Sequence, residues 1–152
     1  MLTTDPKTSL YEQDFYLWIQ ETVEILKKGQ LEQLDIENLI EEVDSMGKSQ
    51  RKELKTRLTV LIEHLLKLQY WTTEKDYNAR GWRNTIVEQR RQIAYTLVDS
   101  PSLKAIINDM FLDCYQDARN DTLRKYQLPS TLCPQESPFS LFEVLDPDFI
   151  PS

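Results

Sequence analysis

One stretch, residues 35–71, carries apolar side chains at steps of three and four residues and predicts a long helix. That spacing gathers the side chains on one face of a helix with 3.6 residues per turn. The stripe consists of Ile36, Leu39, Ile40, Val43, Met46, Leu54, Leu58, Leu61, Ile62, Leu65 and Leu68. Asp35 suits the N-cap position. Gly47 interrupts the stripe, but the apolar phase continues past it, so we predict a continuous or mildly kinked helix.

The segment before this stripe predicts a second helix. Ser9 and Glu12 have the spacing of a capping box, and apolar residues recur at helical intervals as far as Leu26. Lys27 and Lys28 followed by Gly29 form a helix-stop signal. The connection to the long helix is short, which favours antiparallel packing of the two helices.

The segments after Trp71 predict a loop, two more helices and a tail. Residues 72–79 are polar and predict a loop; a helix is expected from about Gly81 to Val98. Ser100 as N-cap and Pro101 at the first helical position predict the next helix, which runs to about Tyr126. Five prolines punctuate residues 128–152, where Ser137 and Pro138 are expected to open a short helix ending before Asp146.

These elements predict an all-α fold: a single-domain bundle of four to five helices with a long central helix. The chain has 152 residues, enough for one domain with its own core, and only 3 glycines. We expect residues 1–8 to be a disordered tail and residues 9–152 to form one helical domain. The proline-rich tail, residues 128–152, still carries many apolar side chains, so we expect it to cover the bundle.

Composition narrows the location and the class of partner. No apolar run approaches the roughly 20 residues that span a bilayer, and no secretory signal begins the chain, so we expect a cytoplasmic protein that does not bind membranes. Cys114 and Cys133 show no metal or redox spacing. The net charge is −7, which disfavours loose nucleic-acid binding. It is uneven: −8 over residues 1–47, +6 over residues 48–92 and −5 over the remainder.

One charged residue, Arg90, occupies a position where the helical phase predicts an apolar side chain. Arg90 lies four residues after Ile86, three before Ile93 and seven before Leu97, so its helical phase points it into an apolar stripe. A buried guanidinium needs a carboxylate or several carbonyl oxygens as partners. The expected partners are Glu41 and Glu42 at the edge of the long stripe.

His64, the only histidine, lies on the same long helix, and Trp18 and Trp82 have indole N–H groups that can join such a network. Two interpretations follow for Glu41, Glu42, His64 and Arg90. The first is a structural polar network that fixes helix register, and it is the commoner case. The second is a small catalytic site with a glutamate base and His64 or Arg90 as its electrostatic partner.

Other site classes find less support. A metal site is disfavoured because the single histidine has Leu61, not glutamate, three residues before it. We therefore assign no metal and no cofactor, and the sequence leaves a small-molecule ligand open. Aromatic and basic residues alternate from Tyr70 to Arg83, a composition found on single-strand binding surfaces, although a loop with tucked aromatic side chains has the same composition.

Several separated motifs resemble one bacterial family, found mainly in cyanobacteria and catalogued as domain of unknown function 29. They are Tyr11-x-x-Asp14-Phe15-x-x-Trp18, Leu39-Ile40-Glu41-Glu42 with Met46-Gly47, Leu61-x-x-His64-Leu65-Leu66-Lys67, Trp82-x-x-Thr85-Ile86 with Gln89-Arg90, and Ser100-Pro101-Ser102-Leu103. The resemblance implies a single all-helical domain with no assigned activity, substrate or cofactor. It places the family's Glu-Glu, His and Arg positions on Glu41, Glu42, His64 and Arg90. The stretch from Tyr70 to Arg80 matches least.

These observations favour an interaction, adaptor or regulatory protein that binds a protein partner or a second copy of itself. A small hydrolase-like enzyme using the Glu/His/Arg cluster is the alternative, and a nucleic-acid binder ranks third. The chain carries no phosphate loop, nucleophile elbow or cysteine–histidine pair that would favour an enzyme.

Overall fold

The long apolar stripe folds as one uninterrupted helix, α3 (Ile36–Tyr70), in a computed structural model that describes residues 9–151. Its 35 residues extend about 52 Å at about 1.5 Å per residue. The helix passes through Gly47 without a break, which confirms the predicted continuous helix. Asp35 begins it: its backbone carbonyl accepts the Leu39 N–H, and its carboxylate accepts a hydrogen bond from the Asn38 side chain at 2.7 Å.

Residues 9–151 contain six α-helices and no β-strand, which confirms the predicted all-α class. They divide into two compact units, the first ending at Lys48 and the second beginning at Ser49. Helix α3 gives its first turns to one unit and the rest to the other. Two compact units can still unfold together as one domain, so the single domain expected over residues 9–152 stays a prediction. The tail expected over residues 1–8 lies outside the described residues.

The first unit holds α1 (Leu10–Gln13), α2 (Phe15–Lys28), the 3-10 helix η2 (Leu31–Gln33) and the first turns of α3. The single helix expected from Ser9 to Lys28 is corrected here, because Asp14 takes a non-helical conformation and its carboxylate accepts the Leu17 N–H at 3.1 Å. The Ser9 side chain makes no capping hydrogen bond. The predicted stop is confirmed: α2 ends at Lys28, and Gly29 has a positive φ of 69°.

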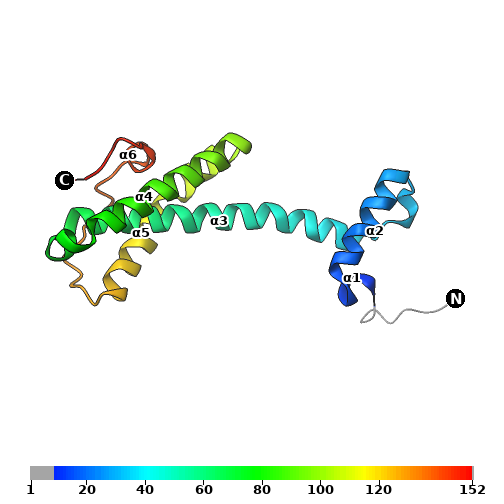
Figure 1. Ribbon diagram of the computed structural model, residues 1–152, viewed down its shortest axis with the longest axis horizontal. Coiled ribbons are helices and arrows are strands. Elements are labelled where there is room, and N and C mark those ends of the chain that lie inside the picture. Colours follow the sequence, from blue (N-terminus) through cyan, green and yellow to red (C-terminus); the bar gives the residue numbers. More distant parts are fainter. Residues whose placement is uncertain (1–8, 152) are drawn as a thin grey trace. The chain divides into compact units, whose positions relative to one another are not determined.

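The second unit packs the rest of α3 against α4 (Thr72–Asp99) and α5 (Leu103–Lys125), with α6 (Leu141–Leu145) over α4 (Figure 1). Its core is one cluster of buried side chains drawn from all of these elements and from the tail. The α3 members of the cluster are Leu54, Leu58, Leu61, Ile62, Leu65, Leu66 and Leu68. Cys133, Phe139 and Val144 bring the C-terminal segment into the same cluster.

The predicted loop over residues 72–79 is wrong, because α4 already begins at Thr72. The backbone turns at Trp71, and the first two turns of α4 are mostly exposed, so they show no apolar stripe. Local hydrogen bonds stabilise these two turns instead: the Asn78 side-chain amide donates to the backbone carbonyl of Glu74 at 3.1 Å.

Two other helix starts are also corrected. Ser100 closes α4 rather than opening the next helix, and α5 begins at Leu103. The short helix in the tail is opened by Ser140, not Ser137, through a capping box with Glu143.

Side chains of α5 hold the tail through its backbone oxygens. Tyr115 Oη donates to the carbonyl of Pro134 at 2.5 Å, and the Gln116 amide donates to that of Gln135 at 2.6 Å. Arg119 donates to the carbonyls of Ser130 and Cys133 at 2.8 and 3.2 Å. None of the helices over residues 9–151 is long and apolar enough to cross a bilayer.

Candidate functional site

The four residues of the predicted Glu/His/Arg cluster are divided between the units: Glu41 and Glu42 lie in the first, His64 and Arg90 in the second. Glu42 accepts a 2.6 Å hydrogen bond from the Tyr11 hydroxyl, and Glu41 is exposed. Glu42, His64 and Arg90 each have a hydrogen-bond partner within their own unit.

His64 is half-buried and donates from Nδ1 to the carbonyl of Val60, 2.7 Å away. Burial lowers the pKa of its imidazole; the hydrogen bond to Val60 acts in the opposite direction, and the nearby Lys67 charge lowers the pKa further. The neutral ring is therefore favoured in the folded chain.

Arg90 is 6% exposed, so its predicted burial is confirmed. Its partners are backbone oxygens: Nε donates to the carbonyl of Val144 at 2.8 Å and Nη2 to that of Glu143 at 3.2 Å. The expected pairing with Glu41 or Glu42 is corrected, because the last turn of α6 brings the backbone carbonyls of Glu143 and Val144 to the guanidinium. Burial lowers the pKa of Arg90, and the Asp146 carboxylate opposes that effect. Arg90 thus fastens α6 to α4.

Trp18 and Trp82 have different surroundings. Trp18 lies in the first unit, 4.9 Å from the Tyr11 ring and 5.9 Å from the Phe15 ring. Trp82 lies in the second unit, stacked on Trp71 at 5.8 Å.

A buried lysine that sequence analysis missed lies beside Trp82. Lys67 is 4% exposed, and its ammonium group donates to the Tyr126 hydroxyl at 2.7 Å. The same nitrogen lies 4.6 Å from the centroid of the Tyr126 ring and 5.8 Å from that of Trp82, where the ring faces attract a cation. Lysine stems often cover apolar surface while the amine reaches water, so helical phase alone gave no signal of full burial.

A second buried charge, Glu63, is 3% exposed and pairs with Lys125 at 3.0 Å. This hydrogen bond raises the pKa of Lys125. The pair lies in a depression of about 500 Å³, whose other charged side chains include Lys55 and Asp117, themselves 3.7 Å apart. No group of histidine, cysteine and carboxylate side chains suited to a metal occurs among residues 9–151.

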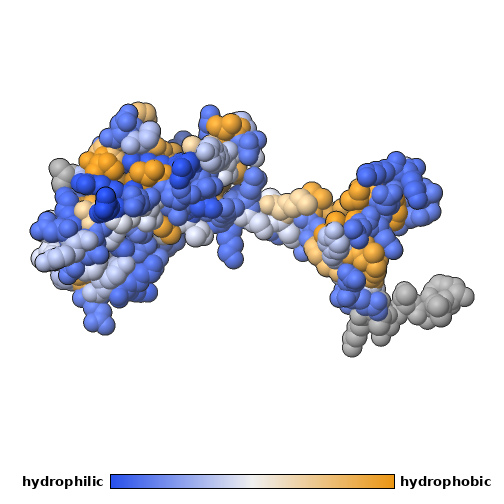
Figure 2. Space-filling view, in the orientation of Figure 1, coloured by the Kyte–Doolittle hydropathy of each residue, from blue (hydrophilic) through white to orange (hydrophobic). Residues whose placement is uncertain are grey.

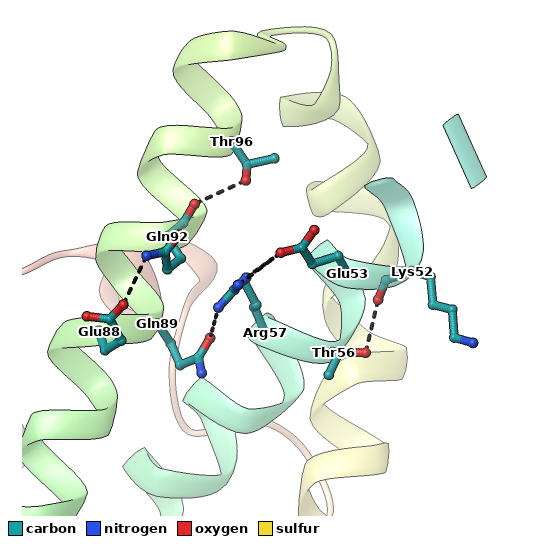
Figure 3. Close-up of polar contacts among 8 residues, drawn as sticks. All are labelled: Lys52, Glu53, Thr56, Arg57, Glu88, Gln89, Gln92 and Thr96. Atoms are coloured by element: carbon teal, nitrogen blue, oxygen red, sulfur yellow. Dashed lines mark hydrogen bonds and ion pairs between the residues drawn. The ribbon is translucent and has the colours of Figure 1, made fainter. Parts of the chain in front are cut away.

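A polar seam joins α3 to α4 on another side of the second unit (Figure 3). Arg57 Nη2 donates to the Glu53 carboxylate at 2.9 Å and Nη1 to the Gln89 side-chain oxygen at 3.2 Å. These residues border a depression of about 420 Å³. These hydrogen bonds tie Arg57 and Glu53 of α3 to Gln89 of α4, so the seam helps to fix the register of the two helices.

Both cysteines are buried and carry free thiols. Burial raises the pKa of Cys114 and of Cys133, so neither is an activated nucleophile.

The first unit has an apolar groove between α2 and the first turns of α3, which we call the hairpin groove. Its volume is about 380 Å³. Helix α2 lines it with Phe15, Trp18, Ile19, Thr22, Val23 and Leu26, and α3 lines it with Leu39, Glu42, Val43 and Met46. Apolar surface gathers over these helices in Figure 2.

The hairpin groove is open to solvent. Val43 and Met46 are 57% and 69% exposed, and Phe15, Ile19, Val23 and Leu26 are also exposed. Sequence analysis found both apolar stripes that line the groove but did not predict that they remain exposed. A stripe shows which face of a helix is apolar, not whether another element covers that face.

One carboxylate, that of Glu42, lines the hairpin groove and accepts a hydrogen bond from Tyr11. Tyr11 packs edge-on against Phe15 and Trp18. The hydrogen bond to Glu42, followed by burial and by the charges of Glu42, Glu41 and Asp35, raises the pKa of Tyr11 to about 12. An acidic side chain, Glu42, therefore lies beside the apolar lining of the groove.

The chain matches the model of one protein family, Domain of unknown function DUF29, over residues 10–150. No curated protein and no solved structure matches the chain.

Proposed function

This chain belongs to the family Domain of unknown function DUF29, which assigns no activity, and we propose from the structure of its first unit that it is a cytoplasmic interaction module that binds another protein through the hairpin groove. The observation that carries the proposal is the exposure of the apolar side chains that line the groove. Contiguous exposed apolar surface on a soluble chain commonly marks a binding site. An adaptor or regulatory role fits such a module, because its work is done by association.

The polar sites support this choice over an enzyme. Arg90 is sealed beneath α6, and its guanidinium is used to hold backbone carbonyls. A catalytic group has to reach its substrate, whereas the exposed apolar side chains of the hairpin groove are accessible to a binding partner.

The proposal is tested by site-specific photo-cross-linking in the cells from which the gene comes. A photoreactive residue replaces Met46 in the hairpin groove or, as the control, Val98, which is 77% exposed in the second unit. We expect one discrete cross-linked protein from position 46 and none from position 98. Equal patterns at the two positions, or no cross-link at either, would contradict the proposal.

A further inference from the structure

We infer that the occupant of the hairpin groove is a basic amphipathic helix of another protein, and not a second copy of this chain. This inference rests on the proposed function and adds the chemistry of the partner. It follows from the shape of the groove, from the kind of side chains on its floor and from the charge around it.

The shape fits a helix. The groove lies between two helices, and a third helix packs into such a groove with its apolar ridge. The α2 side chains that line it run from Phe15 to Leu26, about 17 Å along the helix axis or about three turns. A partner helix of similar length can place apolar residues at i, i+3, i+4 and i+7 on this floor. The flexible thioether of Met46 allows the floor to adapt to their shapes.

The charge selects a basic partner. Residues 9–48 carry ten acidic and three basic side chains, a net charge of −7. Glu42 itself lines the groove, and the charges of Glu41 and Asp35 act on Tyr11, the hydrogen-bond partner of Glu42. Lysine or arginine side chains flanking the apolar stripe of a partner helix would approach these carboxylates, which speeds association and fixes orientation.

The same charge disfavours a second copy bound groove to groove. A symmetric dimer would bring two hairpins, each with a net charge of −7 over residues 9–48, face to face. Carboxylates on both sides of such an interface would lie within about one Debye length, roughly 8 Å at physiological salt, where repulsion is little screened. Apolar complementarity alone would have to overcome that repulsion.

The test is binding of labelled peptides to the full chain, followed by fluorescence anisotropy. The basic probe has about 15 residues, with leucine at the i, i+3, i+4 and i+7 positions and lysine elsewhere. One control peptide keeps the leucines and replaces lysine by glutamate; another keeps the lysines and replaces leucine by serine. We expect the basic amphipathic peptide to bind at least about tenfold more tightly than either control, with affinity falling as salt rises.

Val43→Lys locates the binding site, and Val98→Lys is its matched control because it adds the same charge to an exposed valine of the second unit. We expect Val43→Lys to weaken binding at least about tenfold and Val98→Lys to change it little. Met46→Lys replaces Val43→Lys if circular dichroism shows that the latter is unfolded. Equal loss in the groove and control variants would mean unspecific charge attraction and would overturn the inference.

Sedimentation of the chain without peptide separates this inference from the proposed function. Equal binding of acidic and basic peptides in the groove would overturn the basic partner and leave the interaction module standing. A dimer that Val43→Lys dissociates would replace the basic helix by a second copy. A monomer that binds none of the peptides, with no cross-link at position 46, would remove both.

Discussion

Arg90 holds α6 against α4 through two backbone oxygens, so removing its side chain should release the C-terminal segment. We expect Arg90→Ala to lower the free energy of unfolding by about 2 kcal/mol, since hydrogen bonds from a charged donor contribute about 1.5–3 kcal/mol. We expect a value near the lower end of this range because the buried Nη1 of Arg90 has no hydrogen-bond partner, so its burial already lowers the stability of the parent chain. Urea unfolding gives the total, and hydrogen exchange should show faster exchange at the amides of α6.

Arg91 provides the control for this prediction. It is the next residue of α4, its side chain is 52% exposed, and it pairs with Glu88. Exposed ion pairs contribute only about 0.2–1 kcal/mol, so Arg91→Ala should leave α6 protected from exchange. Equal losses for the two alanine variants would show that the contacts to Glu143 and Val144 do not hold the segment.

His64 should make the folded chain sensitive to mild acid. Burial lowers the pKa of its ring in the folded state, so the unfolded chain binds a proton first as the pH falls below about 6.5. Stability should therefore be fully present above that pH and should fall as the pH drops towards the lowered pKa of the folded chain. Because His64 is the only histidine, urea unfolding between about pH 7.5 and pH 5.5 isolates its titration from that of ordinary carboxylates.

His64→Gln is the matching variant, because it cannot take up the proton. Its free energy of unfolding should be flat over this pH window, whatever its absolute value. A variant that keeps the slope of the parent chain would assign the pH dependence to another group.

At the scale of the element, α3 carries Gly47 in an ordinary helical conformation, and a methyl group added there would contact nothing within 4 Å. Gly47→Ala should therefore stabilise the helix by about 0.5–1 kcal/mol, measured by urea unfolding. Gly29→Ala is the control. It also has free space, but its φ of 69° disfavours a side chain, so this substitution should destabilise the chain by about 1–2 kcal/mol. Equal effects would contradict the helical assignment of Gly47.

Helical phase found the elements whose apolar stripes are continuous, which is why α3 and the burial of Arg90 were predicted correctly, and the Lys27-Lys28-Gly29 stop signal gave the end of α2. It missed the first turns of α4, because exposed polar residues there carry no stripe. It also missed the partners of Arg90 and Arg119, since both donate to backbone oxygens that every residue possesses. The hairpin groove was not predicted for a related reason: the sequence shows that its residues are apolar, but their exposure depends on whether another element packs over them.

At the scale of the whole molecule, burial is very unevenly distributed between the two units. Trp18 is the one buried apolar side chain that the described residues place in the first unit, while the second unit holds a continuous core from Leu54 to Val144. Segments with few buried apolar contacts open locally at low free energy. The stability of the first unit therefore depends more than that of the second on contacts between residues close in the sequence, and we expect the first unit to open at a lower free energy.

Native-state hydrogen exchange tests this difference. The amides of α2 and of α3 before Lys48 should exchange through openings of lower free energy than those of α3 between Leu54 and Leu68, because only the latter turns lie in the core. The step should fall inside one continuous helix, so it cannot be explained by a change of secondary structure. Adding the basic amphipathic peptide should raise protection in the first unit alone, since a ligand stabilises the state that binds it. Equal protection along the whole of α3 would mean that the two units open together, as one cooperative domain over residues 9–152.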